Sequence, residues 1–74
     1  MVRKIKITIN DIEHVVEYFG EDEEEIAIKI QADENALLEY LRTEDDHGCK
    51  AFCFSGLMVR KKSIETARFS EPDF

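Results

Sequence analysis

The 74-residue chain contains no tryptophan, one proline, three glycines and two cysteines, and no long apolar run. A helix needs about 18 consecutive apolar residues to cross a membrane, so the sequence predicts no membrane partner. Cys49 and Cys53 are too few for a disulfide framework, which argues against a small secreted domain held together by disulfides. The first residues lack the apolar core of a signal peptide. These absences predict a cytoplasmic protein with reduced thiols.

The length is close to the lower limit at which one hydrophobic core is sufficient. Hydrophobic residues make up 43% of the chain and are spread along it, which argues against disorder. We therefore expect a single domain over residues 1–74, with residues 70–74 as a short tail.

Negative charge is concentrated in the middle of the chain. Residues 1–10 hold three bases, residues 11–46 hold fourteen acids against Lys29 and Arg42, and residues 47–74 hold five bases against three acids, which gives a net charge of −7. Nucleic acids and anionic membranes are bound chiefly by lysine and arginine. Direct binding to either is not expected, and a basic protein partner is favoured.

Residues 3–9 place Ile5, Ile7 and Ile9 on one face at the two-residue period of a strand. Residues 12–19 have two interpretations. One is a helix, because Asn10 and Glu13 have capping-box spacing and the apolar residues also fit a helical stripe.

The other interpretation of residues 12–19 is a strand, because they are rich in β-branched and aromatic side chains. If Asn10 and Asp11 form a two-residue turn, Ile9 faces Ile12 and Ile5 faces Val16, so the apolar face stays on one side. This register favours a hairpin without excluding the helix.

The central stretch changes its period part-way along. Residues 25–30 alternate three isoleucines with Ala27 and Lys29, which predicts a strand. Asp33 suits an N-cap, and leucines then recur at helical spacing, which predicts a helix over residues 33–42. The strand has one apolar face and the helix has one apolar stripe. Because each can be buried against the other, the sequence predicts a two-layer core.

Residues 50–54 and 57–61 form a second predicted hairpin around Ser55 and Gly56, followed by a last strand over residues 64–69. The predicted fold is α+β, a single small domain in which a mainly antiparallel sheet of about five strands carries the helix 33–42 on one face. The predicted core contains Ile5, Ile7, Ile9, Val16, Ile26, Ile28, Ile30, Leu37, Leu38, Leu41, Phe52, Phe54, Leu57, Val59 and Ile64.

The chain carries no catalytic or cofactor signature. The nearest approach to a metal site is His47 with Cys49 and Cys53, and His14 as the only fourth ligand; their spacings match no standard zinc pair. Cys53 is expected instead to fill space near the sheet. Nothing near the cysteines resembles a nucleophile turn. We therefore expect no enzyme activity, no metal and no cofactor.

Two runs of acids flank the central stretch, and helical acids extend them. They are either a solubilising surface or a partner-binding surface. Alternate residues of a strand lie about 6.6 Å apart, near the spacing of phosphates on an extended nucleic-acid strand. The binding interpretation is thus a nucleic-acid mimic that occludes a basic cleft in a nuclease or nucleoprotein complex. The candidate residues are Glu21, Asp22, Glu23, Glu24, Glu25, Glu34, Glu39, Glu44, Asp45 and Asp46.

In size and charge the chain is similar to the small acidic inhibitors that phages encode against host restriction and CRISPR nucleases. This resemblance is one of composition, and it transfers no residue roles. An alternative function is an assembly module that forms a homodimer or a partner complex through a sheet edge, with residues 64–69 as the candidate edge. A third interpretation is a small basic patch for nucleic acid, formed by Arg60, Lys61, Lys62 and Arg68.

Overall fold

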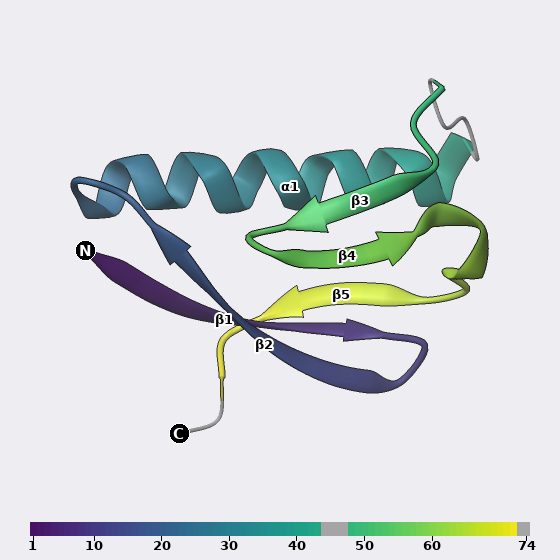
Figure 1. The fold of residues 1–74 in the computed structure, drawn as a ribbon, viewed down its shortest axis with the longest axis horizontal. Helices are drawn as coiled ribbons and strands as arrows, with labels where there is room; N and C mark the ends of the chain where they lie inside the picture. The colour runs from purple at the N-terminus through teal and green to yellow at the C-terminus, as the bar shows by residue number, and fades with distance from the viewer. Residues whose placement is uncertain (44–47, 73–74) are drawn as a thin grey trace.

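A computed structural model describes residues 1–43 and 48–72 of the chain. It contains the strands β1 (Val2–Ile9), β2 (Ile12–Phe19), β3 (Ala51–Phe54), β4 (Leu57–Arg60) and β5 (Ala67–Ser70), the helix α1 (Glu23–Thr43) and the 3-10 turn η1 (Lys61–Ser63). The strands form a sheet in the order β2-β1-β5 and a separate β3-β4 hairpin, with every pair antiparallel. The predicted α+β fold is confirmed (Figure 1).

The first hairpin has the register that the sequence predicts. Ile9 pairs with Ile12 and Ile5 pairs with Val16, so the helical interpretation of residues 12–19 is wrong. Asn10 and Asp11 have φ angles of 51° and 66°. A two-residue turn of this hand needs positive φ at both positions, and Asn and Asp tolerate that conformation better than most residues.

The predicted strand over residues 25–30 is wrong, because these residues form the first part of α1. Ile26 and Ile30 lie one helical turn apart and face the core, whereas Ile28 points away and is 63% exposed. The predicted helix 33–42 is therefore the second half of a longer helix. Asp33 lies inside this helix and is not its N-cap.

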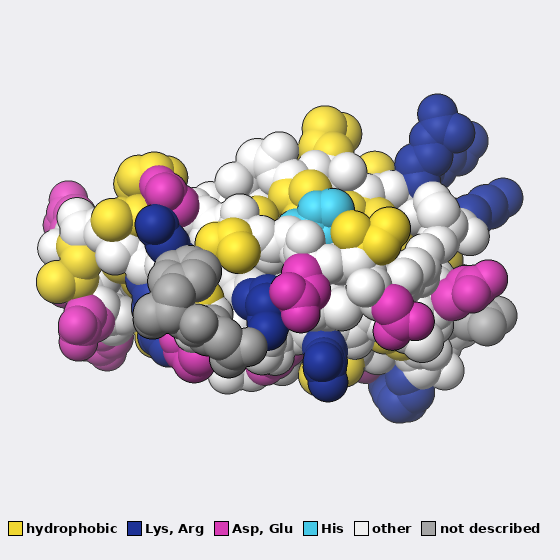
Figure 2. All heavy atoms as spheres, turned by 90° about the horizontal axis from the view of Figure 1, so that it is seen from below, with side chains coloured by type: hydrophobic (Ala, Val, Ile, Leu, Met, Phe, Trp, Pro, Cys, Tyr) yellow, Lys and Arg dark blue, Asp and Glu magenta, His cyan; other side chains and the backbone are white. Residues whose placement is uncertain are grey.

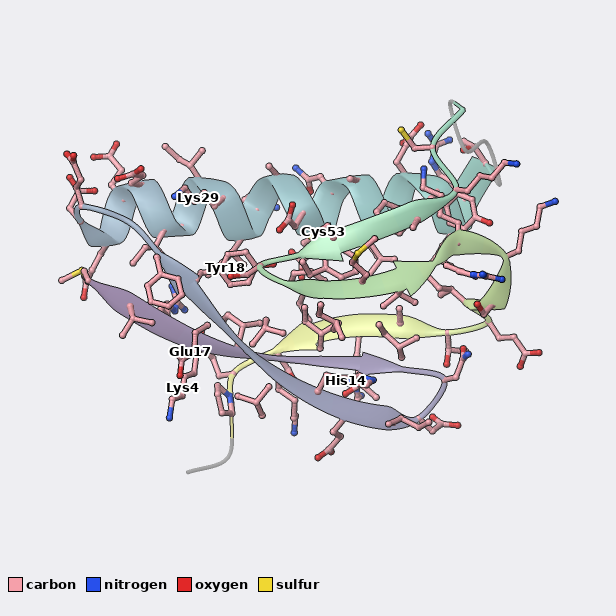
Figure 3. All side chains as sticks on the ribbon, viewed as in Figure 1. Lys4, His14, Glu17, Tyr18, Lys29 and Cys53 are labelled. Carbon is pink, nitrogen blue, oxygen red and sulfur yellow. The ribbon has the colours of Figure 1, made fainter. Side chains whose placement is uncertain are left out.

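Most of the predicted core is confirmed, and two of its members are wrong. Ile28 and Leu38 are 63% and 52% exposed, because the helix turns both away from the sheets. Tyr18 was not predicted in the core but is 3% exposed. Its hydroxyl donates a hydrogen bond of 2.8 Å to Asp33 Oδ2, and Figure 3 shows the ring directed from β2 toward α1.

The second hairpin also has its predicted register, with Phe54 opposite Leu57 and Phe52 opposite Val59. In Figure 1 it lies between α1 and β5. The Phe54 ring stacks on Phe52 at 5.3 Å between centroids and meets Phe69 of β5 edge-on at 5.4 Å. These aromatic contacts join the two sheets into one core.

Two details of this region differ from the prediction. The last strand covers Ala67–Ser70 instead of residues 64–69 and pairs with β1. The prediction that Cys53 fills space near the sheet is wrong, because the residue is exposed on β3, where it pairs with Met58.

Candidate functional site

The acidic run that precedes Ile26 forms the start of α1. Asp22 Oδ1 accepts a hydrogen bond of 2.8 Å from the Glu25 backbone N–H, and Glu25 Oε2 accepts one of 2.7 Å from the Glu21 N–H. This is a capping arrangement that satisfies backbone donors with no partner inside the helix. Two of the five acids thus have a structural task, and the positive end of the helix dipole favours all of them here.

The other acids of this run point into solvent. Glu21, Glu23 and Glu24 are exposed, and among the described residues neither the Glu23 nor the Glu24 side chain has a hydrogen-bond or ion-pair partner. Figure 2 shows acidic side chains at the left-hand end, where α1 begins in Figure 1. This end of the molecule presents a concentrated negative charge.

The remaining candidate acids are spread along α1 and beyond it. Glu34 is half-buried, and Glu39 forms an ion pair of 2.7 Å with Arg42, whose pKa is raised by hydrogen bonding to that carboxylate. The helix is about 31 Å long at 1.5 Å per residue, which separates Glu39 widely from the acids at its start. Glu44, Asp45 and Asp46 lie outside the described residues.

A row of exposed side chains runs along the solvent side of α1, and we call it the outer stripe. Its members recur at alternating spacings of four and three residues, which places them on one helical face. They are Glu24, Ile28, Gln31, Asn35, Leu38 and Arg42. The stripe therefore combines one acid, two amides and one base with two large aliphatic side chains in water. Sequence reasoning missed it because it placed both aliphatic residues in the core.

The outer edge of β2 is partly closed. The hairpin register directs the backbone groups of Glu13, Val15, Glu17 and Phe19 away from β1. The Ser55 hydroxyl donates to the Glu17 carbonyl, and Lys29 Nζ donates to the Phe19 carbonyl at 2.7 Å.

The part of the β2 edge that these two side chains do not cover lies at Glu13 and Val15. Two apolar side chains belong to this part of the edge or lie next to it: Ile12 is 62% exposed and Val15 is 50% exposed. A short apolar length of sheet edge therefore faces solvent.

The Tyr18–Asp33 pair has a structural role. Burial, with the hydrogen bond to Asp33 as the next cause, raises the pKa of the Tyr18 phenol. A phenol held protonated in this way cannot act as a base near neutral pH. In residues 1–43 and 48–72, no three side chains of His, Cys, Asp or Glu are grouped so that they could hold a metal ion.

Comparisons with protein-family models, with curated proteins and with solved structures found no match. Within the described ranges, no helix is both long and apolar enough to cross a membrane.

Proposed function

We propose that the protein is a non-enzymatic binding module that attaches to a basic protein surface through the outer stripe and the acidic start of α1. The observation that carries this proposal is the exposure of Ile28 and Leu38 on one helical face that begins at Glu24, beside the acidic start of α1. Large apolar side chains exposed along one face can mark an interaction surface. Exposed charges are sufficient for a solubilising surface, so solubility does not explain the two exposed aliphatic side chains.

The two kinds of side chain would contribute differently to binding. Exposed carboxylates steer a basic partner and speed association, and this effect weakens as salt shortens the Debye length from about 10 Å at 0.1 M to about 3 Å at 1 M. Buried aliphatic contacts slow dissociation and are much less sensitive to salt. An amphipathic helix that docks in a groove uses both.

The more specific form of this proposal is a competitor that occludes the nucleic-acid cleft of a nuclease or nucleoprotein complex, acting in the cytoplasm. The spacing of carboxylates along a strand no longer supports it, because Glu25 lies in a helix. What supports it is the net charge of −7 and the concentration of exposed acids at the start of α1. The cleft would be lined by lysine and arginine, as clefts for phosphate backbones are.

The test is a pull-down from lysate with tagged protein, with washes at low and then high salt. One variant carries Ile28→Ser and Leu38→Ser, and its matched control carries Val2→Ser and Met58→Ser, which are 49% and 72% exposed elsewhere. We expect the stripe variant to lose the partner and the control to retain it. Equal retention by both variants would contradict the proposal.

A second pair of variants tests the acids without disturbing the helix cap. Glu21, Glu23 and Glu24 are changed to Gln in one variant, and Glu13, Glu17 and Glu65 in its control, so both have the same net charge. We expect only the first variant to lose the salt-sensitive part of binding. If the captured protein binds DNA or RNA, the wild type should also displace that nucleic acid; failure to displace it would reject the occlusion form alone.

A second candidate function is a homodimer formed through the edge of β2. Exposed Ile12 and Val15 beside unpaired backbone favour it. The charges oppose it: antiparallel pairing centred on Val15 puts Glu13 opposite the copy's Glu17, and like charges directly opposite are destabilising. Sedimentation at low and high salt measures the oligomeric state. A salt-resistant dimer that Val15→Lys dissociates would support the homodimer, and a monomer at all protein concentrations would exclude it.

A further inference from the structure

The end of the molecule opposite the acidic helix start carries a pocket at which four basic residues meet. Its volume is about 470 Å³, and it is lined by Lys50, Ala51, Arg60, Lys61 and Lys62. We call it the basic pocket. Its lining residues come from the right-hand end of the ribbon in Figure 1, where β3 begins and η1 follows β4, and dark blue side chains project from the right-hand end in Figure 2.

The second hairpin brings these residues together. Ala51 pairs with Arg60, and the Lys61 N–H donates to the Lys50 carbonyl at 2.9 Å, so the ladder holds residues 50–51 beside residues 60–61. Arg68, by contrast, lines a different pocket with Thr8 and Asp11. The basic patch suggested by the sequence therefore loses Arg68 and gains Lys50.

Lys61 is the buried base of this group and is 6% exposed. Its ammonium group is 4.7 Å from the centroid of the Phe52 ring and 5.4 Å from that of Tyr40. Aromatic faces stabilise a cation at such distances. These contacts hold the Lys61 side chain in place against the rings. Lys50, Arg60 and Lys62 are exposed and can approach a ligand from the rim of the pocket.

We propose that the basic pocket binds a ligand through phosphate groups that carry at least two negative charges. The three exposed cations of Lys50, Arg60 and Lys62 around one concavity exceed what a single carboxylate can neutralise, and arginine and lysine together form strong charge-assisted hydrogen bonds to phosphate oxygens. The volume suits a small molecule, since ligand pockets usually measure about 300–1,000 Å³. The phosphates could belong to a free small molecule or to a nucleic-acid backbone, and both present the same chemistry to these bases.

The binding experiment titrates isotopically labelled protein with sodium pyrophosphate at physiological ionic strength and follows backbone amide signals. We expect saturable shifts confined to the amides of residues 50–51 and 60–62. An Arg60→Gln, Lys62→Gln variant should bind about tenfold more weakly or worse, because two charge-assisted contacts are lost. Lys61 is left unchanged because it is packed against the aromatic rings.

The matched control carries Lys4→Gln and Arg68→Gln, which make the same change in net charge outside the pocket. It should bind pyrophosphate within about twofold of the wild type, a difference below 0.5 kcal/mol. Equal weakening of both variants would show only a general charge effect and overturn the proposal, as would the absence of saturation. Unchanged affinity in the pocket variant would overturn it as well.

A second arm distinguishes the two sources of phosphate. A ten-nucleotide single-stranded DNA is titrated under the same conditions. Tighter binding than pyrophosphate, with a steep salt dependence and the same shifted amides, would assign the phosphates to a nucleic-acid backbone. Binding of pyrophosphate alone would assign them to a small molecule. This pocket is separate from the outer stripe, so its failure leaves the proposed binding module untouched.

Discussion

Replacing Ile26 and Ile28 in turn by alanine tests the helical assignment of residues 23–30. Ile26 is 1% exposed and Ile28 is 63% exposed. Burial of three carbons at about 0.8 kcal/mol each, plus the cavity left behind, predicts a loss of about 2–5 kcal/mol for Ile26→Ala. Ile28→Ala removes little buried area and gains helix propensity of about 0.5 kcal/mol, so it should be neutral or slightly stabilising.

These losses must be compared with the stability of a chain of this length. At about 0.05–0.15 kcal/mol per residue, 74 residues correspond to about 4–11 kcal/mol. Ile26→Ala can therefore come close to unfolding the protein. Ile26→Val, with an expected cost of about 0.5–1.5 kcal/mol, keeps the comparison measurable, and Ile28→Val is its control.

The assay is equilibrium unfolding in urea followed by far-UV circular dichroism, since the chain has no tryptophan to report by fluorescence. In a strand, Ile26 and Ile28 would share a face and both changes would cost similar free energy. Equal destabilisation by the two alanine variants would therefore refute the helix over this segment, and with it the outer stripe.

Three further predictions concern single contacts. Asp22→Ala removes the helix cap and should cost about 1 kcal/mol in urea unfolding; a cost no larger than that of its neighbour Glu23→Ala would contradict the cap. Asn10→Gly keeps the turn conformation but loses the side-chain bonds to residues 63, 65 and 66, so it should cost about 1–3 kcal/mol, and wild-type stability would show that these bonds contribute nothing. The raised pKa of Tyr18 means that the folded state binds the phenol proton more tightly, so this contribution to stability is complete below the unfolded pKa of about 10 and is lost as pH rises above it. Tyr18→Phe should remove that part of the loss, whereas Tyr40→Phe should keep it; identical profiles for both variants would reject the assignment.

The registers of both hairpins were predictable because residues close together in the sequence determine them. A two-residue turn of Asn10 and Asp11, or of Ser55 and Gly56, fixes which residues face each other once the apolar alternation is known. The register of the second hairpin even implied that Lys50 lies close to Lys61. The burial of Lys61 was not predictable, because it depends on Tyr40 of α1, which is distant in sequence.

The start of α1 was missed because the pattern from Ile26 to Ile30 fits two periods. Ile26, Ile28 and Ile30 share a face in a strand, but Ile26 and Ile30 also share a face in a helix. The sequence does contain an indication of this helix start, because Asp22 and Glu25 are three residues apart, which is the spacing of an N-cap residue and its partner in a capping box. The same acids also fit a binding surface, so their pattern in the sequence does not by itself single out the helix-starting role.

The sequence by itself determined the α+β class, the two hairpin registers and the excess of negative charge in the middle of the chain, because turn residues, two-residue periods and charge act over short distances along it. Only the tertiary structure decided that Ile28 and Leu38 face water and that Lys61 lies buried. The physical reason is that one rigid helix of 21 residues must present a single face to the sheets, and its packing there selects which isoleucines and leucines are covered.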